Sequence, residues 1–542
     1  MNFDPHYFPY PSGRQVTYAR KGLVATSQPL AAQIGLDMMK RGGNAFDAIT
    51  ACAAAMTVLE PCSNGIGGDA FAILWSAGEK KLIGLNSSGP APALLTEEHI
   101  RSRGFDAMPR FGTEPVTVPG IPAAWAAISS KYGKLSLAET VEGAAKIAEE
   151  GFPVTPVTAR IWKGSRELYE GERKKHSNGE IFDGWFETFA KNGKTPEPGD
   201  LVRLKAHAQT LREIGRSMAE SFYRGDIAND INAYMKKIGG FLRADDLAQF
   251  YPEWVAPIGI NYRGYDIWEI PPNGQGMVAL LALKILENFD FPFGKDHPDT
   301  LHKQIEALKL AFADGHTYIA DQRKVEVNIA GLLSGEYAKK RSALIGENAL
   351  EPHPGSPDKS GTVYLCAADE EGNMVSYIQS NFNGFGSGIV LPERGIAFQN
   401  RGFGFTLDRN SVKYVEPGKR PFHTIIPGFI TRNGEPVGPF GIMGGAMQPQ
   451  AHLQVVSNLV DFNLNPQAAL DAPRWQWVQG RELLFETAIP SPVAAALARR
   501  GHDIRYEHNE GEFGRGQIIQ RLPNGVYAAG TEMRTDGYIA VW

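Results

Sequence analysis

The stretch "GTVYLCAADEEGNMVSYIQS", residues 361–380, decides how this chain folds, because two strand-like runs flank one tight turn. The turn, residues 369–373, contains a Gly and an Asn, which suit the positive φ angles of a hairpin connection. If the turn centres on Glu371, Ser380 lies directly opposite Thr362, with the two Cβ atoms about 5 Å apart on one face of the sheet. Such Thr–Ser pairs are common in sheets, so the pattern alone leaves a purely structural role open.

The residues before this hairpin, "PHPGSPDKSG" (352–361), are the most obvious Pro/Gly/Ser-rich break deep in the chain. Ser356 and Lys359 have the Ser-x-x-Lys spacing of serine acylating enzymes, but the prolines around them exclude the helix that would align the pair. We therefore interpret the run as a linker, not as a catalytic motif.

The linker ends in Gly361-Thr362, and this junction points to chemistry. A threonine at a chain terminus can act as nucleophile while its own α-amine takes up the hydroxyl proton. An internal threonine gains that amine only if the preceding peptide bond is cut. Glycine before it offers an open carbonyl and a flexible backbone, so Oγ can attack it in an N→O acyl shift. The sequence thus predicts self-cleavage between Gly361 and Thr362.

Outward from the hairpin, the chain is helix-rich before the linker and strand-rich after it. The predicted helices are 31–43, 44–61, 136–151 and 299–321, and a glycine-rich loop runs into a strand within 63–75. The helix at 44–61 begins with an Asn cap and is apolar on nearly every side, which is typical of a helix buried between layers. This arrangement predicts an α+β fold with sheets sandwiched by helices rather than alternating βαβ units.

Composition excludes several classes of protein. The 542 residues carry a net charge of −5, and no basic patch points to nucleic acid or to a membrane surface. The apolar run at 48–62 is interrupted by Glu60 and Pro61 and is shorter than the roughly 20 residues that span a bilayer. Three cysteines in no metal-ligand spacing and an N-terminus unlike a signal peptide favour a cytoplasmic protein.

Cofactor and metal motifs also fail. "GIGG" (65–68) follows a predicted helix and precedes a strand, the reverse of the order in a dinucleotide-binding loop. The 12 histidines are scattered, and neither a His-Glu-x-x-His nor a Gly-x-Ser-x-Gly motif occurs. We predict no cofactor, no metal and no classical Ser-His-Asp triad.

Several segments in order resemble the γ-glutamyltransferase (glutathione hydrolase) family over nearly the whole chain. They include "GGNAFDAITACAAAMTVLEPCSNGIGGDAFAILW" (42–75), "YRGYDIWEIPPNGQG" (262–276), "PGKRPFHTIIPGFI" (417–430) and "GIMGGAMQPQ" (441–450). The resemblance implies a four-layer αββα N-terminal-nucleophile hydrolase sandwich formed by both subunits of a self-cleaved precursor. The large subunit would be 1–361 and the small one 362–542, with a small-molecule amide as substrate. It also allows a homodimer of these heterodimers.

The same resemblance implies roles for individual residues. Thr362 takes the position of the nucleophile, and Ser380 matches the hydroxyl that orients it. Gly444 and Gly445 match the backbone pair of the oxyanion hole, where two fixed amide N–H groups face the developing negative charge. His423 and Thr424 stand where the family usually has two serines near the substrate.

Departures from the family concern the clamp for the glutamyl zwitterion. Ser88 lies where an arginine usually holds the α-carboxylate, and Gly404 lies where an aspartate usually holds the α-amino group. The asparagine expected after the hairpin aligns with Phe382, with Asn383 as a neighbouring candidate. Arg401 has the bidentate fork of a carboxylate anchor, and a structural arginine paired across the sheet is an equal alternative.

Three functions follow from these observations. The first is a self-processing threonine amidohydrolase or acyltransferase that cleaves γ-glutamyl amides. The second uses the same chemistry on a non-glutamyl acid, such as an oxamate-type or glutaryl-type amide, because the usual Arg and Asp are missing. The third is an uncleaved, inactive scaffold, against which the intact Thr362, Ser380 and glycine pair argue.

Overall fold

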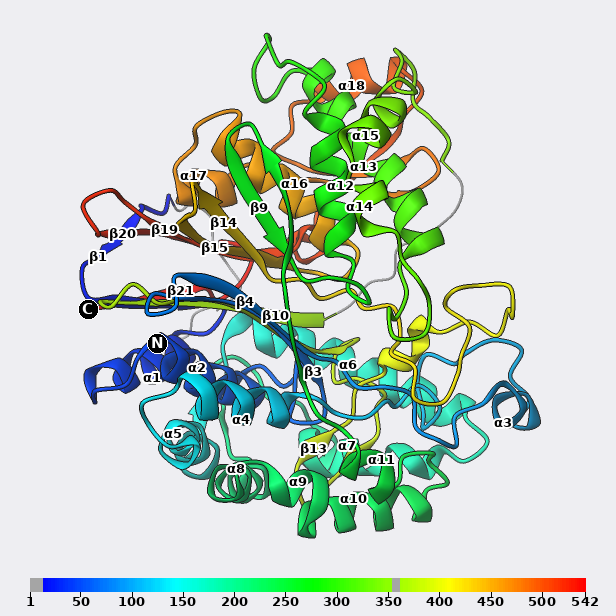
Figure 1. Cartoon of the computed structure of the whole chain (residues 1–542). Helices are drawn as coiled ribbons and strands as arrows, with labels where there is room; N and C mark the ends of the chain where they lie inside the picture. The colour runs from blue at the N-terminus through cyan, green and yellow to red at the C-terminus, as the bar shows by residue number, and fades with distance from the viewer. Residues whose placement is uncertain (1–12, 353–360) are drawn as a thin grey trace, which may run out of the picture.

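Two seven-stranded antiparallel sheets lie face to face, and helices cover the outer face of each (Figure 1). A computed structural model describes residues 13–352 and 361–542 of the chain. The sheets are seen nearly edge-on in the middle of the view, with one group of helices above and another below. This is the four-layer αββα architecture, so the predicted fold class is confirmed.

Each sheet combines strands from both sides of residues 353–360. The Thr362 sheet, named for the residue that β10 carries, has the order β21-β2-β10-β11-β3-β4-β7. Its strands are Tyr538–Val541, Gly22–Thr26, Gly361–Asp369, Met374–Phe382, Asp69–Ser76, Lys81–Ser87 and Glu253–Val255. The second sheet has the order β1-β20-β19-β15-β14-β9-β8. Its strands are Thr17–Ala19, Tyr527–Thr531, Arg515–Arg521, Glu435–Met443, Gly428–Arg432, Tyr265–Glu269 and Ile258–Tyr262. Neither sheet is complete without both parts of the chain.

The helices pack on the two outer faces. On the Thr362 sheet they are α1 (Pro29–Lys40), α2 (Ala45–Leu59) and α4 (Ile121–Tyr132), while α5 (Leu137–Glu150) packs on α2 and α8 (Lys205–Ser217) packs on α5. On the second sheet they are α12 (Gly276–Leu286) and α16 (Met447–Val460), and α13 (Pro298–Tyr318) packs on α12. Strand alternation decides which side chains meet them. In β3, Phe71 and Ile73 pack between the sheets, whereas Ala72 and Leu74 pack against the helices.

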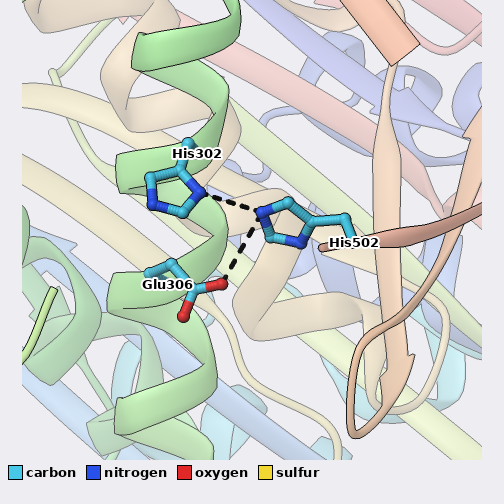
Figure 2. A group of neighbouring side chains, drawn as sticks. All are labelled: His302, Glu306 and His502. Atoms are coloured by element: carbon cyan, nitrogen blue, oxygen red, sulfur yellow. Dashed lines mark hydrogen bonds and ion pairs between the residues drawn. The ribbon is translucent and has the colours of Figure 1, made fainter. Parts of the chain in front are cut away.

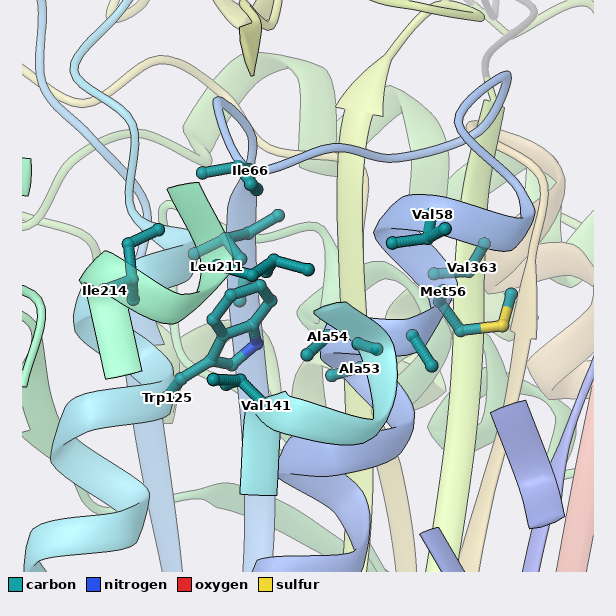
Figure 3. Close-up of a cluster of buried hydrophobic side chains, with 14 of the residues drawn as sticks. Ala53, Ala54, Met56, Val58, Ile66, Trp125, Val141, Leu211, Ile214 and Val363 are labelled. Carbon is teal, nitrogen blue, oxygen red and sulfur yellow. The ribbon is translucent and has the colours of Figure 1, made fainter. Parts of the chain in front are cut away.

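Helix α2 is the buried helix that its sequence predicts. Asn44 and Asp47 form a capping box at its start, and every one of its residues is buried. Figure 3 shows Met56 and Val58 of α2 beside Val363 of β10. The helix therefore backs the strand that carries Thr362 with apolar packing.

The other predicted helices are also confirmed. Ser136 caps α5, and α13 occupies most of the predicted 299–321. The remaining elements lie around the sandwich. The helices are α3 (Glu97–Ser102), α6 (Pro156–Lys175), α7 (Asp183–Phe189), α9 (Glu220–Arg224), α10 (Asp226–Lys237), α11 (Ala244–Ala248), α14 (Ile329–Leu332), α15 (Gly335–Ser342), α17 (Pro466–Asp471) and α18 (Ser491–Arg499). The strands are β5 (Phe152–Pro153), β6 (Leu201–Val202), β12 (Val390–Leu391), β13 (Ile396–Ala397), β16 (Trp475–Gln479), β17 (Glu482–Glu486) and β18 (Asp503–Glu507). Among the described residues, none of the helices has the length and apolar character needed to span a membrane.

The register of the β10–β11 hairpin matches the prediction along most of its length. Val363 pairs with Gln379, and the ladder continues without a shift to Ala368 and Met374. Between Gly361 and Val363 the register shifts, so that Gly361 pairs with Phe382. Thr362 thus lies in an irregular step of the ladder, which repeating strand geometry could not predict. The predicted linker, including Ser356 and Lys359, falls almost wholly outside the described residues.

Candidate active site

Thr362 and Ser380 meet at the open end of the hairpin. The Thr362 side chain is fully buried, and its Oγ1 donates a hydrogen bond to Ser380 Oγ over 3.1 Å. The same Ser380 oxygen accepts the backbone N–H of Phe382 at 2.7 Å. The predicted Thr–Ser contact is therefore present, although the ladder around it is irregular. Ser380 holds a fixed position from which it can orient the threonine hydroxyl.

Phe382 has a strained backbone next to this contact. Its φ of +78° lies in the left-handed region, which a bulky residue enters only at a cost of about 1–3 kcal/mol. Its N–H reaches Ser380, and its ring lies 4.2 Å from the guanidinium carbon of Arg401. The strain is thus compensated by contacts that position Ser380 and Arg401.

Arg401 connects Ser380, the partner of Thr362, to the segment that contains His423 and Thr424. Its Nη2 donates to Ser380 Oγ at 3.3 Å, and its Nη1 donates to Thr424 Oγ1 at 2.7 Å. Burial lowers the pKa of this guanidinium to about 9, an effect that the negative charge of Asp69 opposes. A cation therefore stands beside the threonine, and its Nε has no hydrogen-bond partner among the described residues.

Asp69, at the start of β3, supports the site from behind. One carboxylate oxygen accepts from Gln399 Nε2 at 2.9 Å and from the Gly89 N–H at 3.0 Å. The other lies 3.1 Å from His423 Nε2. Burial raises the pKa of Asp69 to about 7, against the opposing charge of Arg401. Burial also holds the pKa of His423 well below its usual value, so the neutral imidazole donates its Nε2–H to Asp69.

Sequence reasoning did not identify Asp69 or Gln399 as part of the site. The available signal was an acidic residue at the start of an otherwise apolar run, "DAFAILW", directly after a glycine loop. A carboxylate that folding buries so completely needs specific partners. Two of those partners, Gln399 and His423, lie more than 300 residues away in the sequence, so the pattern could not name them.

Gly444 and Gly445 form the turn between β15 and α16. Their φ angles are +141° and +62°, a conformation that L side chains rarely adopt. Among the described residues, no acceptor takes a hydrogen bond from either amide N–H. Gln275 Nε2 donates to the carbonyl oxygens of Gly445 and Thr424, at 2.8 and 2.6 Å. It therefore connects this turn to the segment that contains Thr424, whose side chain accepts from Arg401. Two free amides beside a cavity can stabilise an oxyanion.

A cavity of about 600 Å³ opens next to this turn. Gly444 and Asn383 line it, together with the arginines Arg110, Arg160 and Arg515. The side-chain oxygen of Asn383 accepts from Arg110 Nε at 3.2 Å. Asn383 thus lines the cavity and is held there by Arg110.

Ser88 and His423 are fully buried, and each has polar partners within the protein. The Ser88 hydroxyl donates to Asn86 Oδ1 at 2.8 Å and contacts Asn273. His423 is fully buried against Asp69 and the ring of Phe71. Neither residue lines the cavity, and neither do Thr362, Ser380, Arg401 and Thr424. Hydrogen bonds join these four residues to one another, whereas Ser88 and His423 bond to Asn86 and Asp69. The substrate-binding roles themselves stay predictions.

One group among the described residues has the composition of a metal site. The group consists of three buried residues, His302, Glu306 and His502, whose potential ligand atoms lie within 4.8 Å of one another. Figure 2 shows His302 and Glu306 of α13 facing His502. His302 Nδ1 lies 2.9 Å from His502 Nε2, and Glu306 Oε1 accepts from Lys309 Nζ at 2.8 Å. Lys309 already supplies a cation to this carboxylate, which favours a structural network. Glu306 Oε2 also accepts the Leu350 N–H at 3.0 Å, which fixes the chain just before residue 353.

Comparison with known proteins places this geometry in a family. The family described as Gamma-glutamyltranspeptidase matches residues 31–542. A glutathione hydrolase-like YwrD proenzyme of Bacillus subtilis is 35% identical over 95% of this chain and 98% of its own. An oxamate amidohydrolase proenzyme of Klebsiella pneumoniae is 32% identical over 96% of this chain and 98% of its own.

A solved structure agrees with these sequences. The crystal structure of a cephalosporin acylase from Bacillus halodurans superposes with a TM-score of 0.96 at 55% identity, covering 100% of this chain and 99% of that one. The relatives differ in the substrates that their names state, while fold and length are shared. The chain belongs to the gamma-glutamyltranspeptidase family, whose members are amide hydrolases and acyltransferases of the N-terminal-nucleophile type.

Proposed function

We propose that the protein is a self-processing amide hydrolase in which Thr362 becomes the N-terminal nucleophile. The observation that carries this proposal is the 3.1 Å contact between Thr362 Oγ1 and Ser380 Oγ. Arg401, Thr424 and Gln275 link this contact by hydrogen bonds to the Gly444-Gly445 turn, whose amides donate to no described residue. A hydroxyl, an orienting partner and an oxyanion site are the parts that acyl transfer requires. Gly361 begins β10 directly before Thr362, so the bond to be cut lies at this site.

The reaction then has two stages. The α-amine that cleavage frees on Thr362 accepts the proton of Oγ1, which attacks the amide carbonyl of the substrate. The amides of Gly444 and Gly445 stabilise the tetrahedral oxyanion. The amine leaves with the proton, and water or an acceptor amine releases the acyl group from Thr362. Ser380 Oγ accepts from Arg401 and from the Phe382 N–H, and these two donors hold it next to Thr362 Oγ1.

For the acyl group we propose a non-glutamyl acid, of the oxamate or glutaryl type. Ser88 provides no cation where the family holds the α-carboxylate, and it is buried against Asn86 and Asn273. Gly404 provides no carboxylate for an α-amino group, and a Cβ there would lie 2.9 Å from a backbone oxygen. Arg401 instead places a guanidinium next to the nucleophile, where it can hold a carboxylate close to the scissile bond.

Hydrolysis of γ-glutamyl amides is the second candidate. It is favoured by the family match and by the relative named glutathione hydrolase-like. For a γ-glutamyl group to bind here, Arg401 or a cavity arginine would have to replace the usual carboxylate anchor.

Denaturing electrophoresis tests self-processing. Wild-type protein should give two fragments that separate before Thr362, and Thr362→Ala should remain one chain. Thr362→Ser, which keeps a hydroxyl, is the matched control and should still be cut. A wild-type chain that stays whole after prolonged incubation would support the inactive scaffold and refute the proposal.

A substrate panel tests the acyl group. Release of p-nitroaniline from its γ-glutamyl and glutaryl derivatives is compared with ammonia release from oxamate. We expect turnover of glutaryl or oxamate amides and at least tenfold slower turnover of the γ-glutamyl amide. The reverse order would favour the second candidate.

A further inference from the structure

Arg515 lies beside the oxyanion turn on the neighbouring strand. In the second sheet it pairs directly with Met443, the residue before Gly444. Met443 packs between the two sheets, as does Ile519 four residues along from Arg515. Because alternate side chains of a strand share a face, the Arg515 side chain enters the space between the sheets. It lines the same cavity as Gly444 and Asn383.

The Arg515 side chain is buried and keeps hydrogen-bonding capacity. The residue is 7% exposed, and its Nε has no hydrogen-bond partner among the described residues. Its Nη1 forms an ion pair with Glu60, but Glu60 Oε1 lies 3.7 Å away, too far for a hydrogen bond. The other Glu60 oxygen accepts the Ser27 hydroxyl at 2.6 Å. A buried guanidinium donor without an acceptor is costly, and an acceptor in the cavity would remove that cost.

The backbone around Arg515 is held rigidly. Arg474 Nη1 donates to the carbonyl oxygens of Phe513 and Gly514, each at 3.0 Å. On the other side, the Gly516 N–H donates to Glu532 at 3.0 Å. A fully hydrogen-bonded backbone therefore holds a side chain that has only an ion pair with Glu60 and an Nε without a partner among the described residues. Such preorganisation is expected of a binding residue.

The charged side chains that line the cavity are mostly positive, which suits an anionic ligand. Arg110 and Arg160 line it together with Arg515, and Glu512 is the acidic residue among the lining side chains. The cavity therefore attracts anions. A carboxylate fits a buried arginine fork better than a neutral group, because both oxygens can accept charge-assisted hydrogen bonds.

We propose that Arg515 binds a carboxylate of the substrate and makes this enzyme selective for anionic amides. The inference rests on the proposed function and extends it, because Arg515 is separate from Arg401 and faces the cavity. The carboxylate belongs either to the acyl group, as in a glutaryl amide, or to the leaving amine. Both sources share the same chemistry at Arg515.

Three amides separate these sources. Glutaryl-p-nitroanilide carries a carboxylate on the acyl group, N-valeryl-4-aminobenzoate carries one on the leaving group, and valeryl-p-nitroanilide carries none. For each, kcat/KM of Arg515→Met is divided by that of the wild type, so that intrinsic reactivity cancels. We expect at least a tenfold loss for one carboxylate-bearing amide and less than a twofold loss for valeryl-p-nitroanilide. Equal losses for all three would overturn the proposal.

Three further variants control for damage to the fold. Arg515→Met leaves the buried Glu60 without its neighbouring cation, so Glu60→Gln/Arg515→Met removes both charges together. It should show the same selective loss, and Arg515→Lys should recover part of it. Arg41→Met, on the exposed end of α1, should leave all three substrates unchanged.

A binding measurement tests the subsite without turnover. At constant ionic strength, glutarate should raise the thermal midpoint of wild-type protein, while butyrate, which lacks the second carboxylate, should raise it less. The glutarate shift should disappear in Arg515→Met. An equal shift in both proteins, or none in the wild type, would overturn the subsite. Absence of turnover with an Arg515-dependent shift would refute the proposed function alone.

Discussion

Two buried ionic clusters differ in how completely their hydrogen bonds are made. The site cluster comprises Asp69, Ser380, Arg401, His423 and Thr424. The C-terminal network comprises Arg474, Glu486, Glu532 and Arg534. In the network, no buried side-chain nitrogen or oxygen lacks a partner among the described residues. In the site cluster, Arg401 Nε has none.

The two clusters also treat their carboxylates in opposite ways. Although burial opposes ionisation of Glu532, Arg474 and Arg534 hold its pKa down to about 2. Burial dominates at Asp69 and raises its pKa to about 7. The carboxylate of Glu532 in the network therefore stays ionised at neutral pH. The site cluster instead keeps an Arg401 Nε without a partner among the described residues and an Asp69 that titrates near pH 7. A cluster with every bond made stabilises the fold, and a cluster with donors left over can bind something.

The largest expected effect comes from removing the nucleophile. Thr362→Ala should lower amide turnover at least about 1,000-fold, since it removes the attacking atom while the oxyanion site remains. The thermal midpoint should change little, because alanine fits the same buried strand position. Amide release and calorimetry on the same preparation measure both. Full activity in Thr362→Ala would mean that the site cluster does not perform the chemistry.

Removing one residue of the C-terminal network should lower the free energy of unfolding and leave amide turnover unchanged. Arg534→Met leaves Glu532 and Glu486 buried without their shared cation, which should lower the free energy of unfolding by about 3–5 kcal/mol. Urea unfolding measures this, and turnover per folded molecule should be retained. Arg505→Met is the matched control, since Arg505 pairs with Glu482 at the surface with its side chain 63% exposed. Its cost should stay within about 1 kcal/mol. Equal costs for the two variants would contradict the comparison.

The pH dependence of stability sharpens the contrast in charge. Burial raises the pKa of Asp69 in the folded protein to about 7, from an ordinary value of 3.8. Its contribution to the free energy of unfolding is therefore fully present below pH 4 and is lost as pH rises through 7. Glu532 has the opposite sign, because its contribution is present above pH 4.5 and is lost as pH falls toward 2.

Unfolding free energies at pH 5 and pH 8 test the Asp69 contribution. At about 1.4 kcal/mol per pH unit, wild type should lose about 3 kcal/mol more between these values than Asp69→Asn. The same pH dependence in both proteins would show that Asp69 is ionised throughout.

The smallest expected effect concerns the orienting hydroxyl. Ser380→Ala removes the acceptor of the Thr362 hydrogen bond and should slow amide turnover about tenfold, equivalent to about 1.4 kcal/mol. Ser376→Ala is matched, because Ser376 is a buried serine on the same strand that contacts the Tyr364 hydroxyl at 2.8 Å. It should leave turnover within twofold. Similar losses in both variants would assign Ser380 a structural role.

Local features of this site were predictable from the sequence. The hairpin, its register from Val363 to Ala368 and the contact of Thr362 with Ser380 follow from a two-residue period around one turn. The buried helix α2 follows from its apolar surface and its Asn44 cap. The family resemblance, supported by the match to residues 31–542, added the glycine pair as candidates.

Other features required contacts that no local pattern contains. The shift between Gly361 and Val363 depends on how β10 and β11 separate at their open end. The family resemblance implies substrate contacts for Ser88 and His423, and the structure shows both buried with polar partners, Asn86 and Asp69, that no local pattern names.

The sequence by itself determined the chemistry that this chain can carry: a glycine–threonine junction at a strand edge and an opposing serine. Only the tertiary structure decided the surroundings of that threonine. Asp69 meets His423 across 354 residues, and Arg515 reaches the oxyanion turn because β19 pairs with β15. The physical reason is that strand and helix periods act over a few residues, whereas sheet pairing and burial select partners from the whole chain.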